Sequence, residues 1–201
     1  MLLLVSGATK YERTETVGHL IVPKQWNKPE SIGLVPGRWA MDNGAYSGFD
    51  CAAYMRMLQR FQGYPGCLFV TAPDVVYDAA STLDLWEFWS KVITGLGHRP
   101  AFVAQNGIDH HSMPWTEMDA LFIGGDDAFK DGELSRSLCG YAKAIGMWVH
   151  WGRVNGKRRY ELAQLAGADS IDGSGFSMYS DTRIPMVGDW ERELVQQPRL
   201  L

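Results

Sequence analysis

The chain has 201 residues, of which 46% are hydrophobic and 21% are charged. It is therefore long enough to bury a core and too apolar to be disordered, and one domain over residues 1–201 is the expected organisation. The net charge of −4 excludes the uniform basic field of a protein that coats nucleic acid, but it leaves room for a local basic patch.

The N-terminus and the cysteines narrow the class of protein further. The apolar run from Met1 to Val5 is far shorter than the roughly 20 residues of a membrane span and has no basic flank, so we expect a soluble cytoplasmic protein with no membrane partner. Cys51, Cys67 and Cys139 are odd in number and far apart, which argues against a disulfide framework and a zinc knuckle. We therefore expect no zinc site of cysteines, and the sequence as a whole indicates no metal and no cofactor.

Short apolar runs recur along the chain, with helical periodicity between them. They predict strands that are buried on both faces at residues 2–5, 39–41, 67–72, 101–104, 120–123, 147–150 and 170–171, and residues 19–22 are a candidate for one further strand. Helices are expected at residues 51–61, 78–96 and 132–145, and a further helix capped by Asn155 is expected to run to Ala166. The Pro-rich segment 23–37 is expected to form a long loop over the active face.

Strands that alternate with helices predict parallel pairing, in either a doubly wound sheet or a closed (β/α) barrel. The barrel is favoured because almost every predicted strand ends in a short polar loop that contains glycine. In a TIM barrel all these loops meet at one face, whereas in a doubly wound sheet only those at the switch point meet. We therefore predict a compact α/β TIM-like barrel in which some helices are short or missing, because 201 residues are few for this fold.

Carboxylates follow several of the predicted strands. Asp42, Asp74 and Asp172 each stand at a strand end, and Gln105 stands at another. An aspartate in such a place can also cap the next helix or stabilise a turn. A barrel would bring the side chains together, and neighbouring carboxylates push their pKa values apart, so that one stays ionised while another holds a proton. The pattern indicates a site with a nucleophile and a general acid.

Two further strand ends carry candidate site residues. Gly124 and Gly125 form either a simple turn or a rim where a flat ligand can approach the backbone. His150 is either a hydrogen-bonded histidine of the barrel, a group that acts on the substrate or a metal ligand. A metal site is disfavoured, because the sequence has no His-x-His or His-x-x-x-His pair.

Basic and aromatic residues surround the same rim. A basic cluster, which is either a solvated helix face or a phosphate-binding surface, comprises Arg153, Lys157, Arg158 and Arg159. The loop after the first predicted strand contains two further cations that could join this basic cluster on the same face, Lys10 and Arg13. Aromatic side chains that either anchor the rim loops or stack on a nucleic-acid base are Tyr46, Phe49 and Phe176.

In order and spacing, the strand ends resemble those of one enzyme family. The segments concerned are Met41-Asp42-Asn43-Gly44-Ala45-Tyr46, Pro73-Asp74-Val75-Val76, Val103-Ala104-Gln105-Asn106-Gly107, Ile123-Gly124-Gly125, His150-Trp151-Gly152-Arg153 and Asp169-Ser170-Ile171-Asp172-Gly173. Together they resemble the tRNA-guanine transglycosylase superfamily, which includes relatives that insert 7-deazaguanines into DNA. The resemblance extends over residues 42–174.

The resemblance implies a role for each matching residue. Asp172 corresponds to the nucleophile, which attacks the sugar C1′ and forms a covalent glycosyl-aspartate. Asp42 corresponds to the general acid/base that handles the proton of the leaving and entering bases. Asp74 corresponds to the carboxylate that reads N1–H and the exocyclic amine of guanine. The groups that bind the O6 side correspond to Gln105 and the backbone of Gly124 and Gly125.

Departures from the family bear on the substrate. No cysteine follows Cys139, so the zinc site of the tRNA enzymes is not expected, and the short segment after Asp172 leaves little room for a domain that grips an anticodon stem. Asn43 and Ala45 stand where those enzymes have small Ser and Gly residues, which implies an altered base pocket. We therefore expect DNA, in preference to tRNA, as the nucleic-acid partner and a free 7-deazaguanine base as the second substrate.

The leading hypothesis is a pentosyltransferase that replaces guanine in DNA with a 7-deazaguanine. The alternatives are a tRNA-guanine transglycosylase, an N-glycosidase or nucleoside-level transferase on the same barrel, and a non-catalytic module that binds a base or a nucleic acid. A homodimer, or a partner protein that delivers the substrate, is compatible with all of these.

Overall fold

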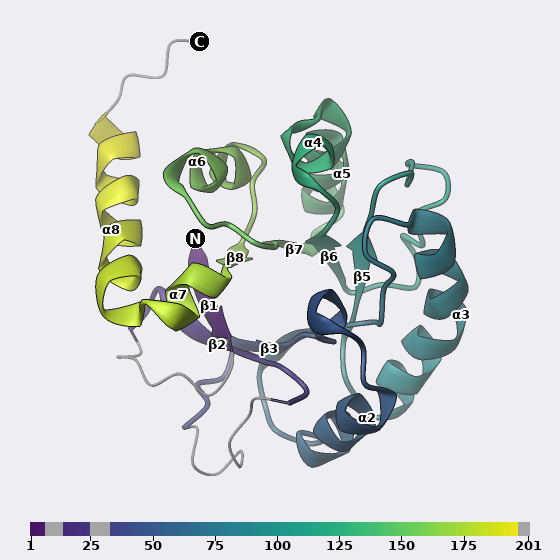
Figure 1. Cartoon of the computed structure of the whole chain (residues 1–201). Coiled ribbons are helices and arrows are strands. Elements are labelled where there is room, and N and C mark those ends of the chain that lie inside the picture. The colour runs from purple at the N-terminus through teal and green to yellow at the C-terminus, as the bar shows by residue number, and fades with distance from the viewer. Residues whose placement is uncertain (7–13, 25–32, 197–201) are drawn as a thin grey trace.

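Eight parallel strands form a closed barrel in this computed structural model, which describes residues 1–6, 14–24 and 33–196 (Figure 1). Each strand pairs with the next along the chain, and the last closes the barrel on the first. The strands are β1 (Leu2–Ser6), β2 (Val17–Ile21), β3 (Trp39–Met41), β4 (Cys67–Thr71), β5 (Pro100–Ala104), β6 (Ala120–Ile123), β7 (Trp148–Trp151) and β8 (Ser170–Asp172). The predicted TIM-like barrel is confirmed.

Helices surround the barrel on its outer side (Figure 1). They are α2 (Cys51–Arg60), α3 (Ala79–Gly95), α4 (Asp127–Asp131), α5 (Glu133–Ala144), α6 (Lys157–Leu165) and α8 (Ser180–Gln196). Two short elements lie at the mouth of the barrel, the 3-10 turn η1 (Ala45–Ser47) after β3 and the helix α7 (Ser174–Met178) after β8. The connection from β5 to β6, residues 105–119, contains no helix, which agrees with the expectation that some helices would be missing. No helix in the described ranges is long and apolar enough to cross a membrane.

Three helices begin at aspartates that lie beyond the strand ends. Asp50, Asp78 and Asp126 precede α2, α3 and α4, and each accepts a hydrogen bond from the backbone N–H three residues later, at 2.9, 3.1 and 2.8 Å. Such a carboxylate satisfies one of the amide groups that a helix leaves unpaired at its N-terminus. The aspartates at the strand ends themselves are therefore not needed as helix caps.

The predicted cap of α6 was wrong. Gly156, not Asn155, is the N-cap residue, and no side chain caps the helix. The Asn155 side chain instead accepts a hydrogen bond from the backbone N–H of Gly175 at 3.1 Å, and so joins the loop after β7 to the start of α7. The predicted loop at residues 23–37 lies partly outside the described residues.

The apolar side chains form two layers. One cluster contains residues of both strands and helices and fills the space between them; Phe102 of β5, for example, packs edge-on against Trp86 of α3 at a centroid distance of 5.4 Å. The other cluster contains only strand residues, among them Leu4, Leu20 and Phe69, and therefore fills the inside of the barrel. The interior is closed by side chains, which leaves the carboxyl ends of the strands as the place for a site.

The contact between β5 and α3 predicts a large loss of stability on truncation. Phe102→Ala removes a fully buried ring, and we expect the free energy of unfolding in urea to fall by about 3–5 kcal/mol. Phe88 of α3 is 63% exposed, so Phe88→Ala should cost much less. Equal losses in the two variants would contradict this account of the core.

Candidate functional site

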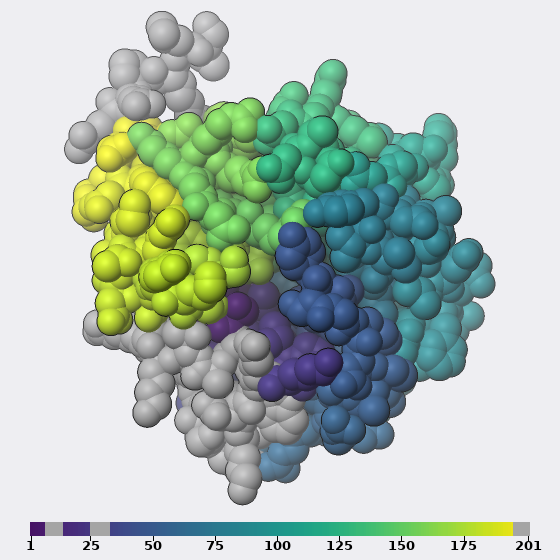
Figure 2. Space-filling model, viewed as in Figure 1, coloured from purple at the N-terminus to yellow at the C-terminus, as the bar shows by residue number. Residues whose placement is uncertain are grey.

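A pocket of about 390 Å³ opens at the carboxyl ends of the strands. The space-filling view shows the corresponding hollow between the segment around η1 and the start of α7 (Figure 2). Residues from separate strand ends, which the sequence analysis had placed at one site, line this pocket together: Asp42, Tyr46, Asp74, Gln105, Gly124, Gly125, Arg153 and Asp172. The barrel thus gathers side chains that are up to 130 positions apart in the sequence (172 − 42).

Asp74 is held by two side-chain amides. The Nδ2 group of Asn43 donates to Oδ1 at 2.7 Å, and the Nε2 group of Gln105 donates to Oδ2 at 2.6 Å. Asn43 is itself fixed, because its Nδ2 also donates to the carbonyl of Ala72 at 2.7 Å. Burial raises the pKa of Asp74 against the effect of these hydrogen bonds. The two amides therefore fix the orientation of the carboxylate toward the pocket, and among the described residues no cation is in direct contact with it.

The backbone N–H groups of the two glycines after β6 are hydrogen-bonded within the protein. The N–H of Gly125 donates to Oε1 of Gln105 at 2.8 Å, and the N–H of Gly124 donates to the carbonyl of Ala104 at 3.0 Å. Both amides are therefore engaged within the protein and do not face an empty base site. A side chain at position 124 would lie 2.8 Å from Nε2 of Gln105, so Gly124 leaves the space in which the Gln105 amide lies.

Asp172, at the end of β8, is restrained through one of its oxygens. The backbone N–H of Arg153 donates to Oδ1 at 2.6 Å, and Nε2 of His150 lies 3.5 Å from the same atom. Burial opposes ionisation, but the contacts with His150, Arg153 and the more distant Lys130 hold the pKa of Asp172 below its usual range. Within the described part of the chain no group donates to Oδ2, so this oxygen is left for a substrate.

Asp42, at the end of β3, has the opposite ionisation behaviour. Burial, followed by repulsion from Asp172 and Asp74, raises the pKa of Asp42 to about 7. Two donors partly oppose this shift, the hydroxyl of Thr71 at 3.2 Å and the backbone N–H of Gly44 at 3.3 Å. One pocket therefore holds an ionised carboxylate and a carboxyl group that can give or take a proton near neutral pH.

Arg153 connects three loops at the mouth of the pocket. Its guanidinium lies over the ring of Tyr46 at 4.6 Å from the centroid, donates to the hydroxyl of Tyr77 at 3.3 Å and also donates to the carbonyl of Gly125. Arg153 and Tyr77 are the two residues other than glycine with positive φ in the described ranges, at 59° and 69°. Backbone strain of this kind persists where the surrounding contacts enforce it, commonly at functional sites.

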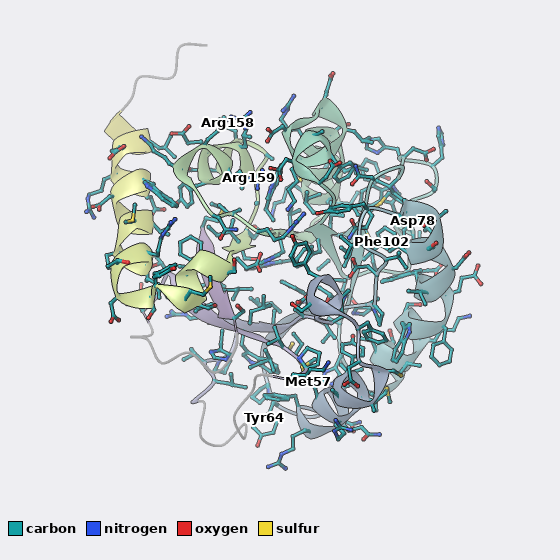
Figure 3. The ribbon with its side chains drawn as sticks, viewed as in Figure 1. Met57, Tyr64, Asp78, Phe102, Arg158 and Arg159 are labelled. Atoms are coloured by element: carbon teal, nitrogen blue, oxygen red, sulfur yellow. The ribbon has the colours of Figure 1, made fainter. Side chains whose placement is uncertain are left out.

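The rest of the predicted basic cluster does not face the pocket. On α6, where Figure 3 labels Arg158 and Arg159, each basic side chain has a carboxylate partner. Lys157 pairs with Glu193 of α8, whereas Arg158 and Arg159 pair with Asp131 and Asp127 of α4. In this structure these side chains therefore link α6 to α4 and α8. Lys10 and Arg13 lie outside the described residues.

Two of the predicted substrate contacts lie in the interior of the protein. Phe176 is 1% exposed and packs against Trp190 of α8 at a centroid distance of 6.4 Å, so it is not placed to stack on a base. His150 is fully buried below the pocket. Phe49 is partly exposed and packs edge-on against Tyr54 and Trp89, as a loop anchor does.

The structure also shows site residues that the sequence analysis missed. Asn43 and Thr71 hold the carboxylates of Asp74 and Asp42, and Tyr77 holds Arg153. Lys130 of α4 is 1% exposed and donates to the carbonyl of Gly152 at 2.7 Å, and its burial lowers the pKa of the amine to about 7. Asn43 was noted only as a departure from the family pattern, and nothing in the sequence marks Lys130 as buried.

Comparisons of the sequence with known proteins give no further indication of what the site does. No protein-family model matches the chain, and no curated protein is similar to it in sequence. Among the described residues, no group of three His, Cys, Asp or Glu side chains is arranged to hold a metal ion.

The electrostatics of the pocket predict how Asp42 titrates. In carboxyl carbon-13 NMR spectra, we expect Asp42 to titrate with a midpoint near pH 7, because of burial and its two acidic neighbours. Asp172→Asn removes one of the repelling charges and should lower the pKa of Asp42. Asp84→Asn, on the exposed side of α3, is the matched control. An unchanged Asp42 midpoint in Asp172→Asn would contradict the proposed coupling.

The raised pKa of Asp42 also means that its ionisation destabilises the folded protein. Because the pKa of Asp42 is raised on folding, its contribution favours the fold at acid pH and is lost as the pH rises toward and beyond 7. Asp42→Asn removes a charge that the fold disfavours. We therefore expect the variant to gain stability relative to the native protein between pH 4 and pH 8, by roughly 2–4 kcal/mol in urea unfolding. A gain that does not depend on pH would rule out this cause.

Proposed function

We propose that the protein exchanges bases in a nucleic acid, replacing guanine with a free 7-deazaguanine through a covalent link to Asp172. The observation that carries this proposal is the pair of carboxylates with opposite ionisation in one pocket: Asp172, whose pKa is lowered, and Asp42, whose pKa is raised to about 7. A double displacement at one carbon needs an ionised nucleophile and a separate group that carries protons. A module that only binds a base needs neither.

Recognition of the base is assigned to Asp74 and Gln105. The edge of guanine presents two adjacent donors, N1–H and the exocyclic amine, which one carboxylate can accept together. Asp74 is held for this purpose by Asn43 and Gln105. One hydrogen of the Gln105 Nε2 group is used on Asp74, and the second is available for the O6 acceptor of the base, a role that the engaged backbone N–H groups of Gly124 and Gly125 do not fill.

The reaction proceeds in two displacements. In the first, Oδ2 of Asp172 attacks C1′, the bond from C1′ to the base breaks with its electron pair on the base, and Asp42 gives its proton to the departing guanine. In the second, ionised Asp42 takes a proton from the incoming 7-deazaguanine, whose nitrogen attacks C1′ and displaces the Asp172 carboxylate. Proton transfer of this kind contributes about 10²–10⁴ to the rate.

A base within a duplex cannot reach such a pocket, so it must first leave its stack. Tyr46 is 66% exposed at the pocket mouth, where it can stack on the extruded base. Arg153 lies over the Tyr46 ring and is the member of the predicted basic cluster that lines the pocket. We propose DNA as the polymer, and the incorporation experiment compares it with tRNA.

Incorporation of a labelled base tests the proposal directly. The protein is incubated with guanine-containing double-stranded DNA, and separately with tRNA, together with labelled 7-deazaguanine bases, and the digested nucleosides are analysed by mass spectrometry. We expect label in DNA, no incorporation by Asp172→Ala, and a rate about 10²–10⁴ lower for Asp42→Asn. Asp84→Asn, the exposed control on α3, should retain the native rate.

Other products would identify the other reactions. Label in tRNA alone would assign the protein to the tRNA branch, and abasic sugars formed without added base would identify an N-glycosidase. Absence of any product with both polymers, or full function of Asp42→Asn and Asp172→Asn in the native setting, would overturn the proposed transfer reaction.

A further inference from the structure

His150 lies in the interior of the barrel, directly below the nucleophile. Its ring is fully buried between two phenylalanine rings, Phe69 of β4 at a centroid distance of 5.2 Å and Phe122 of β6 at 4.6 Å. Phe122 also lines the pocket, whereas His150 does not. The ring therefore cannot touch a substrate, yet its Nε2 atom lies 3.5 Å from Oδ1 of Asp172.

The other ring nitrogen of His150, Nδ1, belongs to a short chain of hydrogen bonds. The indole N–H of Trp148 donates to Oγ of Ser170 at 2.8 Å, and the same Oγ lies 2.8 Å from Nδ1 of His150. An indole N–H can only donate, so the Ser170 oxygen is an acceptor in the first contact. Its own proton then has one acceptor among these groups, Nδ1 of His150. The imidazole proton is thereby placed on Nε2, which faces Asp172.

The strand register makes this arrangement rigid. His150 of β7 pairs with Ser170 of β8, and Ser170 and Asp172 are two positions apart on the same strand, so both side chains point to the same face of the sheet. A ring on β7 can consequently contact both of them. A site built on strands is held more accurately than one built on loops.

From this geometry we infer that His150 is a positioning residue for Asp172, with its proton directed to Oδ1 by the Ser170 hydroxyl and the Trp148 N–H. The inference rests on the proposed function, in which Asp172 is the nucleophile. The Nε2–H of His150 and the backbone N–H of Arg153 both approach Oδ1. They orient the carboxylate so that Oδ2 faces the pocket.

The contact also has a role during the reaction. When Oδ2 bonds to C1′, Oδ1 becomes an ester carbonyl and loses negative charge; when the sugar leaves, the charge returns. A donor at Oδ1 favours the ionised carboxylate, both as the attacking and as the departing group. At 3.5 Å, Nε2 makes no hydrogen bond to Oδ1 in this structure, but contacts of this kind in sites without substrate commonly shorten in the complex.

Other charged groups also affect the pKa of Asp172, and their influence must be distinguished from that of His150. Arg153 approaches it from the loop after β7, Lys130 from α4 and Asp42 from the end of β3 across the pocket. None of these residues is changed by a substitution at His150 or Ser170. A change in the titration of Asp172 in those variants therefore reports the histidine contact.

The test is an NMR titration of the Asp172 carboxyl carbon in the native protein and in three variants. His150→Leu removes the donor, and we expect the pKa of Asp172 to rise by about 1. Ser170→Ala leaves the ring but removes the hydroxyl that fixes its proton, and should give a smaller rise. His150→Gln keeps an N–H near the position of Nε2 and should restore much of the native value. His111→Leu, in an exposed loop, is the control.

Two additional readouts separate this inference from the proposed function. Nitrogen-15 spectra of native His150 should show the proton on Nε2; a proton on Nδ1, or an Asp172 pKa that is the same in His150→Leu as in the native protein, would overturn the inference. Where base exchange is observed, the acid-side limb of its pH profile should move to higher pH in His150→Leu, so that activity recovers as the pH is raised. If the pKa of Asp172 changes but no base is exchanged, the proposed function fails while the contact stands.

Discussion

Three half-buried carboxylates share one pocket, and the arrangement of the barrel mouth follows from the need to keep them there. Like charges in a region of low dielectric repel strongly, and burial adds a penalty for each charge. The protein resolves this conflict differently at each position. Asp172 is stabilised as an anion by nearby donors, Asp74 is held by neutral amides, and Asp42 has a raised pKa and so carries a proton for part of the neutral range.

The donors that make this possible come from neighbouring strand ends. Asn43 reaches from the end of β3 to Asp74 after β4, and Gln105 reaches the same carboxylate from the end of β5. Gln105 also accepts hydrogen bonds from the N–H groups of Tyr77 and Gly125, at 2.9 and 2.8 Å. One amide side chain thus ties together the loops after β4, β5 and β6. Such a network has few alternative arrangements, because each missing partner would leave a buried polar group unsatisfied.

The interior of the barrel supports the pocket from below. Apolar strand residues fill the lower part of the barrel, and Trp148, Ser170 and His150 form a polar chain between this layer and Asp172. The Trp148 N–H, the Ser170 hydroxyl and Nδ1 of His150 are hydrogen-bonded to one another, which allows them to lie in an apolar interior, while Nε2 of His150 lies 3.5 Å from Asp172. The closed apolar core offsets the stability that is lost by placing charges at the mouth. An apolar interior below a polar site at the carboxyl ends of the strands is typical of this type of barrel.

The barrel and the strand ends that meet at the pocket could be predicted from the sequence, because the apolar runs and the glycine-containing loops are local patterns. Asp42, Asp74, Gln105 and Asp172 were likewise predicted to share one site, and all four line the pocket. The partners of these groups became visible only in the folded chain, where the amides of Gly124 and Gly125 are engaged, the cations of α6 pair with carboxylates, and His150 lies below the pocket. The reason is that pairing and burial depend on contacts between distant segments, and the spacing of residues along one strand or helix does not determine them.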